Sequence, residues 1–285
     1  AAVSNAGALG LIGAGGMSPE MFRDSIRRCR SLTDKPFGVN IMLMHPQVEE
    51  LAAIAAEEKV AVVTTGAGDP SRFIPAWKEA GIKVFPVVPA VALAKLVAKR
   101  GADGVIAEGT ESGGHVGETT TMALVPQVVD AVDIPVIAAG GIADGAEMAR
   151  YMKEGAAGAQ FATRFIATEE CDTSPAYKQR LLDARDEDIA IVQSPVGLPG
   201  RALRSPLIER VEAGTQPAVE RCMKCLSACD YKTAPYCISR ALIAAVRGDW
   251  ENGLFFCGAG AGKVNRLSTV RAQMEQIMSE WRAAQ

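Results

Sequence analysis

The 285-residue sequence has little net charge, only two histidines and few aromatic residues, at 5%. Its 30 Lys and Arg against 33 Asp and Glu leave a net charge of −3, so it lacks the basic excess expected of a nucleic-acid-binding protein. The most apolar run, residues 134–142, is interrupted by proline and glycine and is far shorter than the roughly 20 residues of a membrane helix. We therefore expect neither a nucleic-acid partner nor a membrane span.

The start of the sequence shows no export signal, since Ala1-Ala-Val-Ser-Asn5 carries neither a basic region nor an apolar one. The seven cysteines are an odd number in a long chain, which argues against the disulfide framework of a secreted protein. Both features predict a cytoplasmic protein.

Short β-rich apolar runs alternate with amphipathic stretches of about a dozen residues, a pattern typical of parallel strands joined by crossover helices. The expected strands are 7–13, 37–43, 60–65, 84–88, 104–107, 136–139 and 158–163, and the expected helices between them are 19–30, 46–58, 70–80, 91–100, 122–132 and 146–154. Seven such units predict an α/β fold of the TIM (β/α)₈ barrel type, with the first strand trimmed from the N-terminus or one strand misread.

The regular alternation ends after Ala184. We expect residues 1–185 to form the barrel, and residues 186–285 to form a cysteine-containing helical extension that covers the barrel mouth and shares the same core. A last helix is expected over 267–284. The Gly-rich run Gly258-Ala-Gly-Ala-Gly262 is a weak candidate for a nucleotide loop, because no Lys-Ser or Lys-Thr pair follows it.

Barrel enzymes carry their chemistry at the carboxyl ends of the strands, so residues that follow each apolar run are the candidate site. Gly140-Gly141 follows one expected strand, and Ala162-Thr163 lies at the end of the next. Such small residues let backbone N–H groups approach a phosphate. The alternative is two tight turns, and we favour the phosphate site.

His115 lies in the Gly-rich loop 108–117, where Gly113 and Gly114 precede it. The flanking glycines favour a catalytic imidazole over a surface histidine. Asn40 and Glu108 are polar residues near the ends of apolar strands, and burial without partners would cost each about 1 to 3 kcal/mol. Each is therefore expected to bond to a protein or ligand group, whereas His45 is expected to line the barrel mouth or lie at the surface.

Several of these runs, in order along the first two thirds of the chain, resemble the FMN-dependent enoyl-ACP reductase II and nitronate monooxygenase (2-nitropropane dioxygenase) family. The matching runs are Lys35-Pro-Phe-Gly-Val-Asn-Ile-Met-Leu43, Val63-Thr-Thr-Gly-Ala-Gly68, Pro86-Val-Val-Pro89, Ala107-Glu-Gly109, Gly113-Gly-His-Val-Gly117, Thr120-Thr-Met122, Ala138-Ala-Gly-Gly-Ile-Ala-Asp-Gly145 and Thr163-Arg-Phe165. Family members usually begin with a strand that ends in Gln-Gly-Gly-Met, and this chain starts after that point.

The resemblance implies FMN at the barrel mouth, with its phosphate on Gly140, Gly141, Ala162 and Thr163. The rest of the cofactor would contact residues including Asn40, Glu108, Gly113, Gly114 and Gln127. His115 matches the active-site histidine of the family. In the reductase branch, NAD(P)H is the reductant and a trans-2-enoyl thioester, carried by acyl carrier protein in fatty-acid synthesis, is reduced at its β-carbon.

In the other branch, the matching histidine handles an alkyl nitronate that FMN oxidises with O₂. The run of residues 111–117, together with Thr120-Thr-Met122, favours the reductase. A flavin-binding barrel without turnover is a third interpretation, against which the strand-end glycines and His115 argue. A carrier protein would need a basic docking patch, for which Lys95, Lys99, Arg100, Arg201 and Arg204 are candidates, although solvated charge is the simpler interpretation. A homodimer is typical of such barrels.

Four cysteines lie within sixteen residues, at Cys222, Cys225, Cys229 and Cys237. The spacing suits a [4Fe–4S] cluster or a structural Zn site. Three of the positions also share one helical face, where the cysteines would pack as small apolar residues. The two interpretations are equally weighted.

Overall fold

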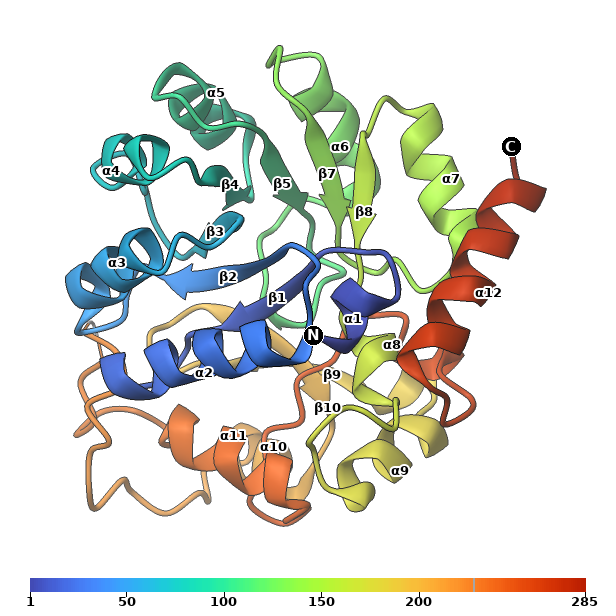
Figure 1. Cartoon of the computed structure of the whole chain (residues 1–285). Helices are drawn as coiled ribbons and strands as arrows, with labels where there is room; N and C mark the ends of the chain where they lie inside the picture. Colours follow the sequence, from blue (N-terminus) through green and yellow to red (C-terminus); the bar gives the residue numbers. More distant parts are fainter. Residues whose placement is uncertain (228) are drawn as a thin grey trace.

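The computed structural model describes residues 1–227 and 229–285 and contains a curled sheet of seven parallel strands, paired in chain order (Figure 1). The strands are β1 (Gly10–Gly13), β2 (Phe37–Met42), β3 (Val62–Gly66), β4 (Lys83–Val88), β5 (Val105–Glu108), β7 (Val136–Ala139) and β8 (Gly158–Gln160). The helices that follow them are α2 (Pro19–Leu32), α3 (Val48–Glu57), α4 (Ile74–Glu79), α5 (Val91–Lys99), α6 (Thr121–Val129), α7 (Gly145–Lys153) and α8 (Thr163–Ile166). This is the predicted TIM-barrel architecture, with β1 and β8 at the two edges of the sheet.

Local sequence signals explain where several helices begin. Ser18 caps α2 by accepting a hydrogen bond from the Met21 amide at 3.3 Å, and Pro19 occupies the first helical turn. Asp144 caps α7 in the same way, at 2.8 Å from the Glu147 amide. Asp69 instead accepts from the Ser71 amide in a turn, so α4 begins at Ile74 and later than expected.

The barrel core consists of two clusters of apolar side chains between the sheet and its helices. One contains Val39, Ile41 and Trp77, and the other contains Val105 and Leu124, all with 2% exposure or less. Buried parallel strands are apolar on both faces, which is why the sequence shows them as continuous apolar runs. The expected strand 158–163 is shorter in the structure because α8 begins at Thr163.

The C-terminal third adds a second sheet that the sequence did not predict. Its three antiparallel strands, in the order β6-β10-β9, are β6 (Gly114–His115), β9 (Ile189–Gln193) and β10 (Pro199–Leu203). Gly200 pairs with His115, so a strand of the extension holds the histidine loop of the barrel. The remaining elements are α1 (Ala2–Asn5), α9 (Pro175–Asp183), α10 (Pro206–Glu212), α11 (Ile238–Arg247), α12 (Val270–Ala283) and the 3₁₀ turns 186–188 and 261–263.

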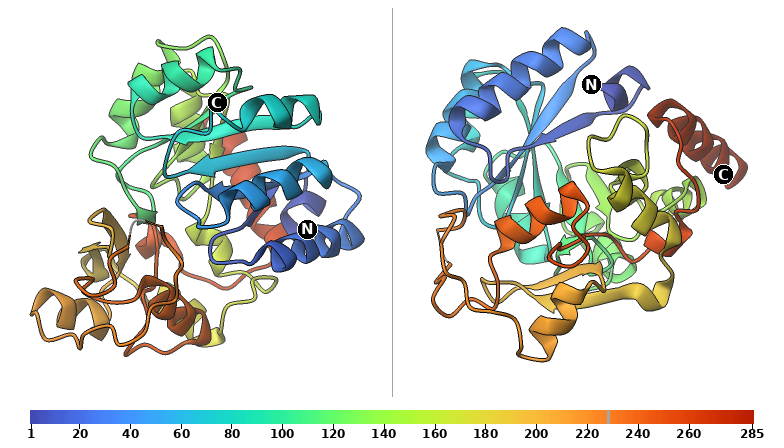
Figure 2. Two further views of the ribbon diagram at one scale, coloured as in Figure 1. Left: turned by 90° about the vertical axis from the view of Figure 1, so that its left-hand side faces the viewer. Right: turned by 90° about the horizontal axis from the view of Figure 1, so that it is seen from below.

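The extension lies beside one end of the barrel, and α12 returns to pack along α7 (Figures 1 and 2). Gly145 permits this contact, because a Cβ at this position would lie 1.9 Å from the Ile277 carbonyl oxygen. The Gly145 amide donates to Glu280 on α12 at 2.9 Å. Residues of the extension also form two apolar clusters of their own, around Ile208 and Phe255. In the described part of the chain, no helix is both long and apolar enough to cross a membrane.

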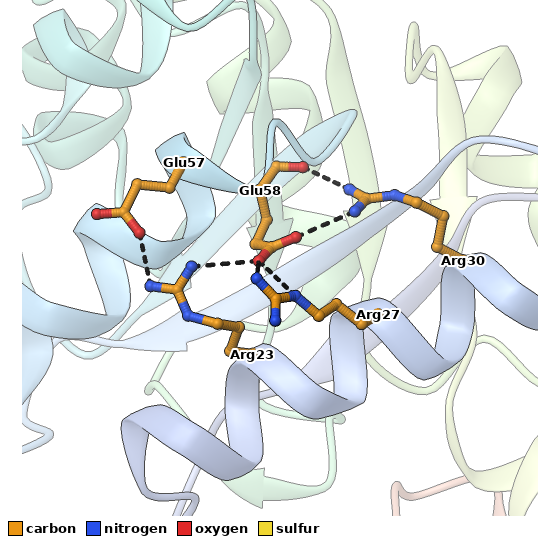
Figure 3. A network of polar contacts seen from close by, with 5 residues as sticks. All are labelled: Arg23, Arg27, Arg30, Glu57 and Glu58. Atoms are coloured by element: carbon orange, nitrogen blue, oxygen red, sulfur yellow. Dashed lines mark hydrogen bonds and ion pairs between the residues drawn. The ribbon is translucent and has the colours of Figure 1, made fainter.

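Glu58, at the end of α3, accepts from three arginines of α2 (Figure 3). Arg23 and Arg30 contact its two carboxylate oxygens at 3.2 and 3.0 Å, and Arg27 lies 2.9 Å away. The Glu58 side chain is 8% exposed. Burial opposes its ionisation, but hydrogen bonds from Arg30 and Arg23 outweigh burial and lower the pKa of Glu58. The network joins two helices that cover neighbouring strands.

We expect Glu58→Gln to lower the free energy of unfolding by about 1 to 2 kcal/mol at pH 7, because three guanidinium groups lose their shared counter-charge. A group with a lowered folded-state pKa stabilises the fold above its unfolded pKa and loses that contribution as the pH falls through the folded value. The difference between wild type and variant should therefore disappear at acidic pH. Urea unfolding at pH 7 and pH 3 measures it, and an equal difference at both values would contradict the electrostatic origin.

Candidate functional site

A cavity opens at the carboxyl ends of β5, β7 and β8, where a barrel places its site. It is lined by Glu108, Ser112, Gly113, Gly114, Ala139, Gly140, Gly141, Ile142, Ala143, Gln160, Ala162, Thr163, Arg164, Ile166, Phe256, Cys257, Gly258, Gly260 and Val264. The last five of these residues come from the extension. We call this the glycine-lined cavity.

Glycines form its walls because the backbone segments approach one another too closely for side chains. Gly140 and Gly141 have φ of +109° and +72°, and a Cβ on Gly141 would lie 2.8 Å from the Glu111 Cβ. A Cβ on Gly113 would lie 2.6 Å from the carbonyl carbon of Cys257. The loop at 257–258 therefore packs directly against the histidine loop and closes this side of the cavity.

The amides at the start of α7 are already occupied. Ala143 N–H donates to Glu147 at 2.6 Å, and Gly145 N–H donates to Glu280. The nearest cation in the cavity wall is Arg164, which donates to the Ala143 carbonyl at 2.5 Å. An anion in this cavity would therefore meet the double-glycine turn and Arg164 rather than the first turn of α7.

Two polar side chains of the cavity are unusual, Ser112 in its hydrogen bonding and Glu108 in its pKa. The Ser112 hydroxyl is buried and makes no hydrogen bond with any described residue. Burial raises the pKa of Glu108 to about 7, although the nearby Ser112 opposes the shift. Buried polar groups normally have partners, so an unsatisfied hydroxyl in a cavity wall indicates a ligand position.

A second cavity, of about 510 Å³, lies between the barrel and the extension. Its wall combines the β1–α2 loop, the end of β2 and the segment around α11, and is mostly apolar. The lining residues are Gly15, Gly16, Met17, Ser18, Met42, His45, Pro46, Gln47, His115, Met223, Lys224, Cys225, Leu226, Ile238, Ser239, Leu242, Ile243 and Phe256. His45 accepts from the Gln47 amide through Nδ1 at 3.1 Å, and burial lowers its pKa, so it is a neutral wall residue.

His115 lies where the two cavities meet. It lines the second cavity, its neighbour Gly114 lines the glycine-lined cavity, and Phe256 lines both. The ring of Phe256 meets the imidazole edge to face, with centroids 6.0 Å apart. Burial lowers the pKa of His115, and its Nε2 is buried with no hydrogen-bond partner among the described residues. A neutral imidazole with a free ring nitrogen can donate to or accept from a small molecule.

The loop that carries His115 is fixed at several points. Glu111 accepts from the amide and the hydroxyl of Thr121, both at 2.8 Å. Arg201 donates to the Thr110 carbonyl at 2.7 Å, and the pairing of β6 with β10 holds the histidine itself. Arg201 thus fixes the histidine loop, and Arg204 pairs with Glu212 at 2.6 Å.

The structure brings most of the predicted cofactor residues together in the glycine-lined cavity: Glu108, Gly113, Gly114, Gly140, Gly141, Ala162 and Thr163. Two predicted residues do not line this cavity, and their contact with a cofactor stays a prediction. Gln127 is exposed on the outer face of α6 and lines neither cavity, because Val125 and Val128 occupy the buried face of that helix. Asn40 donates to Thr64 on the neighbouring strand at 2.8 Å.

Sequence reasoning missed Gln160, Arg164, Phe256 and Cys257 as cavity residues, and it undervalued Gly258 and Gly260. Gln160 is the last residue of β8, and the strand-end rule missed it because the expected strand extended to residue 163. The Gly-rich run at 258–262 was a visible signal, but its position late in the chain concealed its place at the mouth. Its contact with Thr163, whose hydroxyl accepts from the Gly258 amide at 2.8 Å, depends on the tertiary fold.

The four clustered cysteines are reduced and partly buried. Burial and the neighbouring thiols of Cys225 and Cys222 raise the pKa of Cys229. Cys225 and Cys229 pack against the apolar cluster of the extension. Among the described residues, no three His, Cys, Asp or Glu side chains are placed to hold a metal ion, so the [4Fe–4S] or Zn site stays a prediction.

The fold is that of a TIM-barrel protein with a cavity at the carboxyl ends of its strands. The family model for nitronate monooxygenase matches residues 1–59 and 48–280. The chain therefore belongs to the nitronate monooxygenase family.

Relatives and solved structures fall into differently named groups. FabK from Thermotoga maritima is 41% identical, with a TM-score of 0.89 over 99% of this chain and 87% of that one. Nitroalkane oxidase from Streptomyces ansochromogenes is 26% identical, with a TM-score of 0.84 over 99% and 91%. A probable nitronate monooxygenase from Staphylococcus saprophyticus is 31% identical over 74% of this chain and 73% of its own length.

A further relative from Rhodococcus jostii is named (3aS,4S,5R,7aS)-5-hydroxy-7a-methyl-1-oxo-octahydro-1H-indene-4-carboxyl-CoA dehydrogenase. It is 37% identical to this chain over 74% of the chain. The match covers 60% of that relative's own length.

Proposed function

We propose that the protein is an FMN-dependent reductase that uses NAD(P)H to reduce trans-2-enoyl thioesters. The observation that carries the proposal is the position of His115, which lines the larger apolar cavity next to the glycine-lined one and has a buried Nε2 with no partner among the described residues. This arrangement separates a site for a phosphate-bearing cofactor from a site for an apolar acyl chain. The likeness to FabK and the resemblance of the motifs to enoyl-ACP reductase II support it.

The residues of the glycine-lined cavity fit FMN. Gly140 and Gly141 would hold the phosphate beside Thr163 and the guanidinium of Arg164. The unsatisfied Ser112 hydroxyl and Glu108 would face the remainder of the cofactor. When bound, FMN would supply hydride transfer from NAD(P)H to the β-carbon of the enoyl thioester, and a proton added at the α-carbon would complete the reduction.

His115 acts on the substrate side. Reduction at the β-carbon moves negative charge toward the thioester carbonyl oxygen, and an imidazole N–H can donate a hydrogen bond to that charge. Because burial keeps His115 neutral, it donates without holding a positive charge in the apolar cavity. Phe256 packs against the imidazole on one side.

Glu108 is expected to stay protonated below about pH 7, where it donates a hydrogen bond into the glycine-lined cavity. Its raised folded-state pKa stabilises the fold at low pH and loses this contribution as the pH rises from the unfolded value toward 7. Relative to Glu108→Gln, the wild-type apoprotein should lose about 3 kcal/mol between pH 4 and pH 8, from 1.36 kcal/mol per pKa unit. Urea unfolding at both pH values tests this, and parallel stabilities of the two proteins would show that Glu108 has an ordinary pKa.

The second candidate is oxidation of alkyl nitronates by O₂, which the family name and the nitroalkane oxidase likeness favour. A pair of assays distinguishes the two reactions. FMN-loaded protein is assayed for NAD(P)H consumption with a crotonyl thioester, and for O₂ consumption with propyl nitronate in the absence of nicotinamide. We expect thioester-dependent NAD(P)H consumption. O₂ uptake with the nitronate and no thioester turnover would instead establish the oxidase.

A further inference from the structure

A third cavity lies next to the second one and is rich in positive charge. It is lined by Glu220, Arg221, Cys222, Met223, Lys224, Tyr231 and Arg240. The wall of this cavity therefore contains three cationic side chains and one carboxylate, that of Glu220. Within residues 1–227 and 229–285, no ion pair of 4 Å or less involves Arg221, Lys224 or Arg240. The three cations outnumber the single carboxylate of Glu220 in this wall, and such an excess of positive charge favours an anionic ligand.

The third cavity adjoins the second, because Met223 and Lys224 line both. The connecting loop has a defined conformation. Lys224 has a φ of +52°, and its amide donates to the Cys222 sulfur at 3.2 Å. Ser227 N–H donates to the Met44 carbonyl at 3.2 Å, which fastens the loop to the end of β2. Lys224 is therefore held at the boundary between an apolar cavity and a cationic one.

We propose that the third cavity binds the phosphate groups and the adenine of a coenzyme A thioester whose acyl chain occupies the second cavity. The inference rests on the proposed function, since His115 lines that second cavity. Three cations suit the several phosphates of coenzyme A, and Tyr231, half-buried in the same wall, offers an aromatic ring for adenine. The carboxyl-CoA name of the Rhodococcus jostii relative agrees with this ligand class.

In the test, coenzyme A is titrated into the FMN-loaded 285-residue protein, and binding is measured by calorimetry. The double variant Lys224→Ala/Arg240→Ala should weaken binding at least tenfold, because two charged contacts to phosphate are lost. Lys95→Ala/Lys99→Ala, on exposed positions of α5, is the matched control and should bind as wild type does. Binding to wild type should also weaken with added salt, as expected for contacts between exposed charges.

A turnover comparison adds a second readout. The KM for crotonyl-coenzyme A should rise at least ten times more in the double variant than the KM for the N-acetylcysteamine thioester, which has no phosphate. When Arg240→Lys replaces Arg240→Ala, the positive charge is kept, and most of the increase in KM for crotonyl-coenzyme A that Arg240→Ala causes should disappear. Equal coenzyme A binding by wild type and double variant would overturn the proposal, and so would a loss confined to carrier-protein thioesters. Since coenzyme A binding needs no turnover, it can succeed or fail independently of the proposed reaction.

Discussion

His115→Ala is expected to lower the turnover of an enoyl thioester at least about tenfold while FMN stays bound, the low end of what a positioned hydrogen-bonding or proton-transfer group contributes. The side chain lines the second cavity, and the backbone around it is held by β10 and by the close contact of Gly113 with Cys257. Removing the imidazole therefore removes Nε2 without opening the glycine-lined cavity. Turnover per bound flavin, with the flavin quantified by its absorbance, measures the effect.

His115→Gln gives the matched comparison, because its amide keeps an N–H donor near the same place. We expect it to recover part of the lost turnover, chiefly in kcat, since a contact that strengthens in the transition state acts on kcat more than on KM. Unchanged turnover in the Ala variant would remove His115 from the mechanism. Loss of flavin from the Ala variant would instead assign the residue to cofactor binding.

Gly141→Asp is expected to abolish FMN binding. The residue has a φ of +72°, and the new Cβ would approach Glu111 to 2.8 Å, so the turn must move. The added carboxylate would also lie against the expected phosphate, and like charges at close range in a poorly solvated site repel strongly. Purified variant protein should lack the flavin absorbance, and equilibrium titration with FMN should show no binding at concentrations that saturate wild type.

Gly81→Asp is the control for backbone strain alone. Gly81 has a φ of +78° in the turn before β4, and a Cβ added there would meet no other atom of the described residues within 4 Å. Gly81 lines neither the glycine-lined cavity nor the second one. The substitution should lower stability and leave FMN binding intact. A yellow Gly141→Asp protein with full flavin content would contradict the phosphate assignment, whereas loss of flavin in both variants would reduce the effect to general destabilisation.

The barrel was predictable because its signals are local. Buried parallel strands such as 136–139 show as apolar runs, and capping residues such as Ser18 mark the helix that follows. The second sheet was not predictable in this way. β6 has two residues, Gly114 and His115, and its partner β10 lies about 85 positions later, so its formation depends on tertiary pairing rather than on any local pattern.

The residues of the candidate site also divide into those with a local sequence signal and those that only the tertiary fold brings to the site. Glycines with positive φ at a strand end, as at Gly140 and Gly141, can be found from the sequence because no other residue suits that turn. Gln127 lies outside both cavities, and helical periodicity indicates this, because it places the residue on the exposed face between the buried Val125 and Val128. The contribution of Phe256 and Cys257 could not be read at all, because the chain returns to the mouth only through the folded extension.

The most direct test of the proposed function is anaerobic. FMN-loaded protein is mixed with one equivalent of NADH or NADPH, and the flavin absorbance is followed before and after addition of crotonyl thioester. We predict that at least one nicotinamide bleaches the flavin absorbance. The crotonyl thioester should then restore the absorbance as one equivalent of butyryl thioester, identified by mass, is formed. Bleaching that only O₂ reverses, or no bleaching by either nicotinamide, would contradict an enoyl reductase.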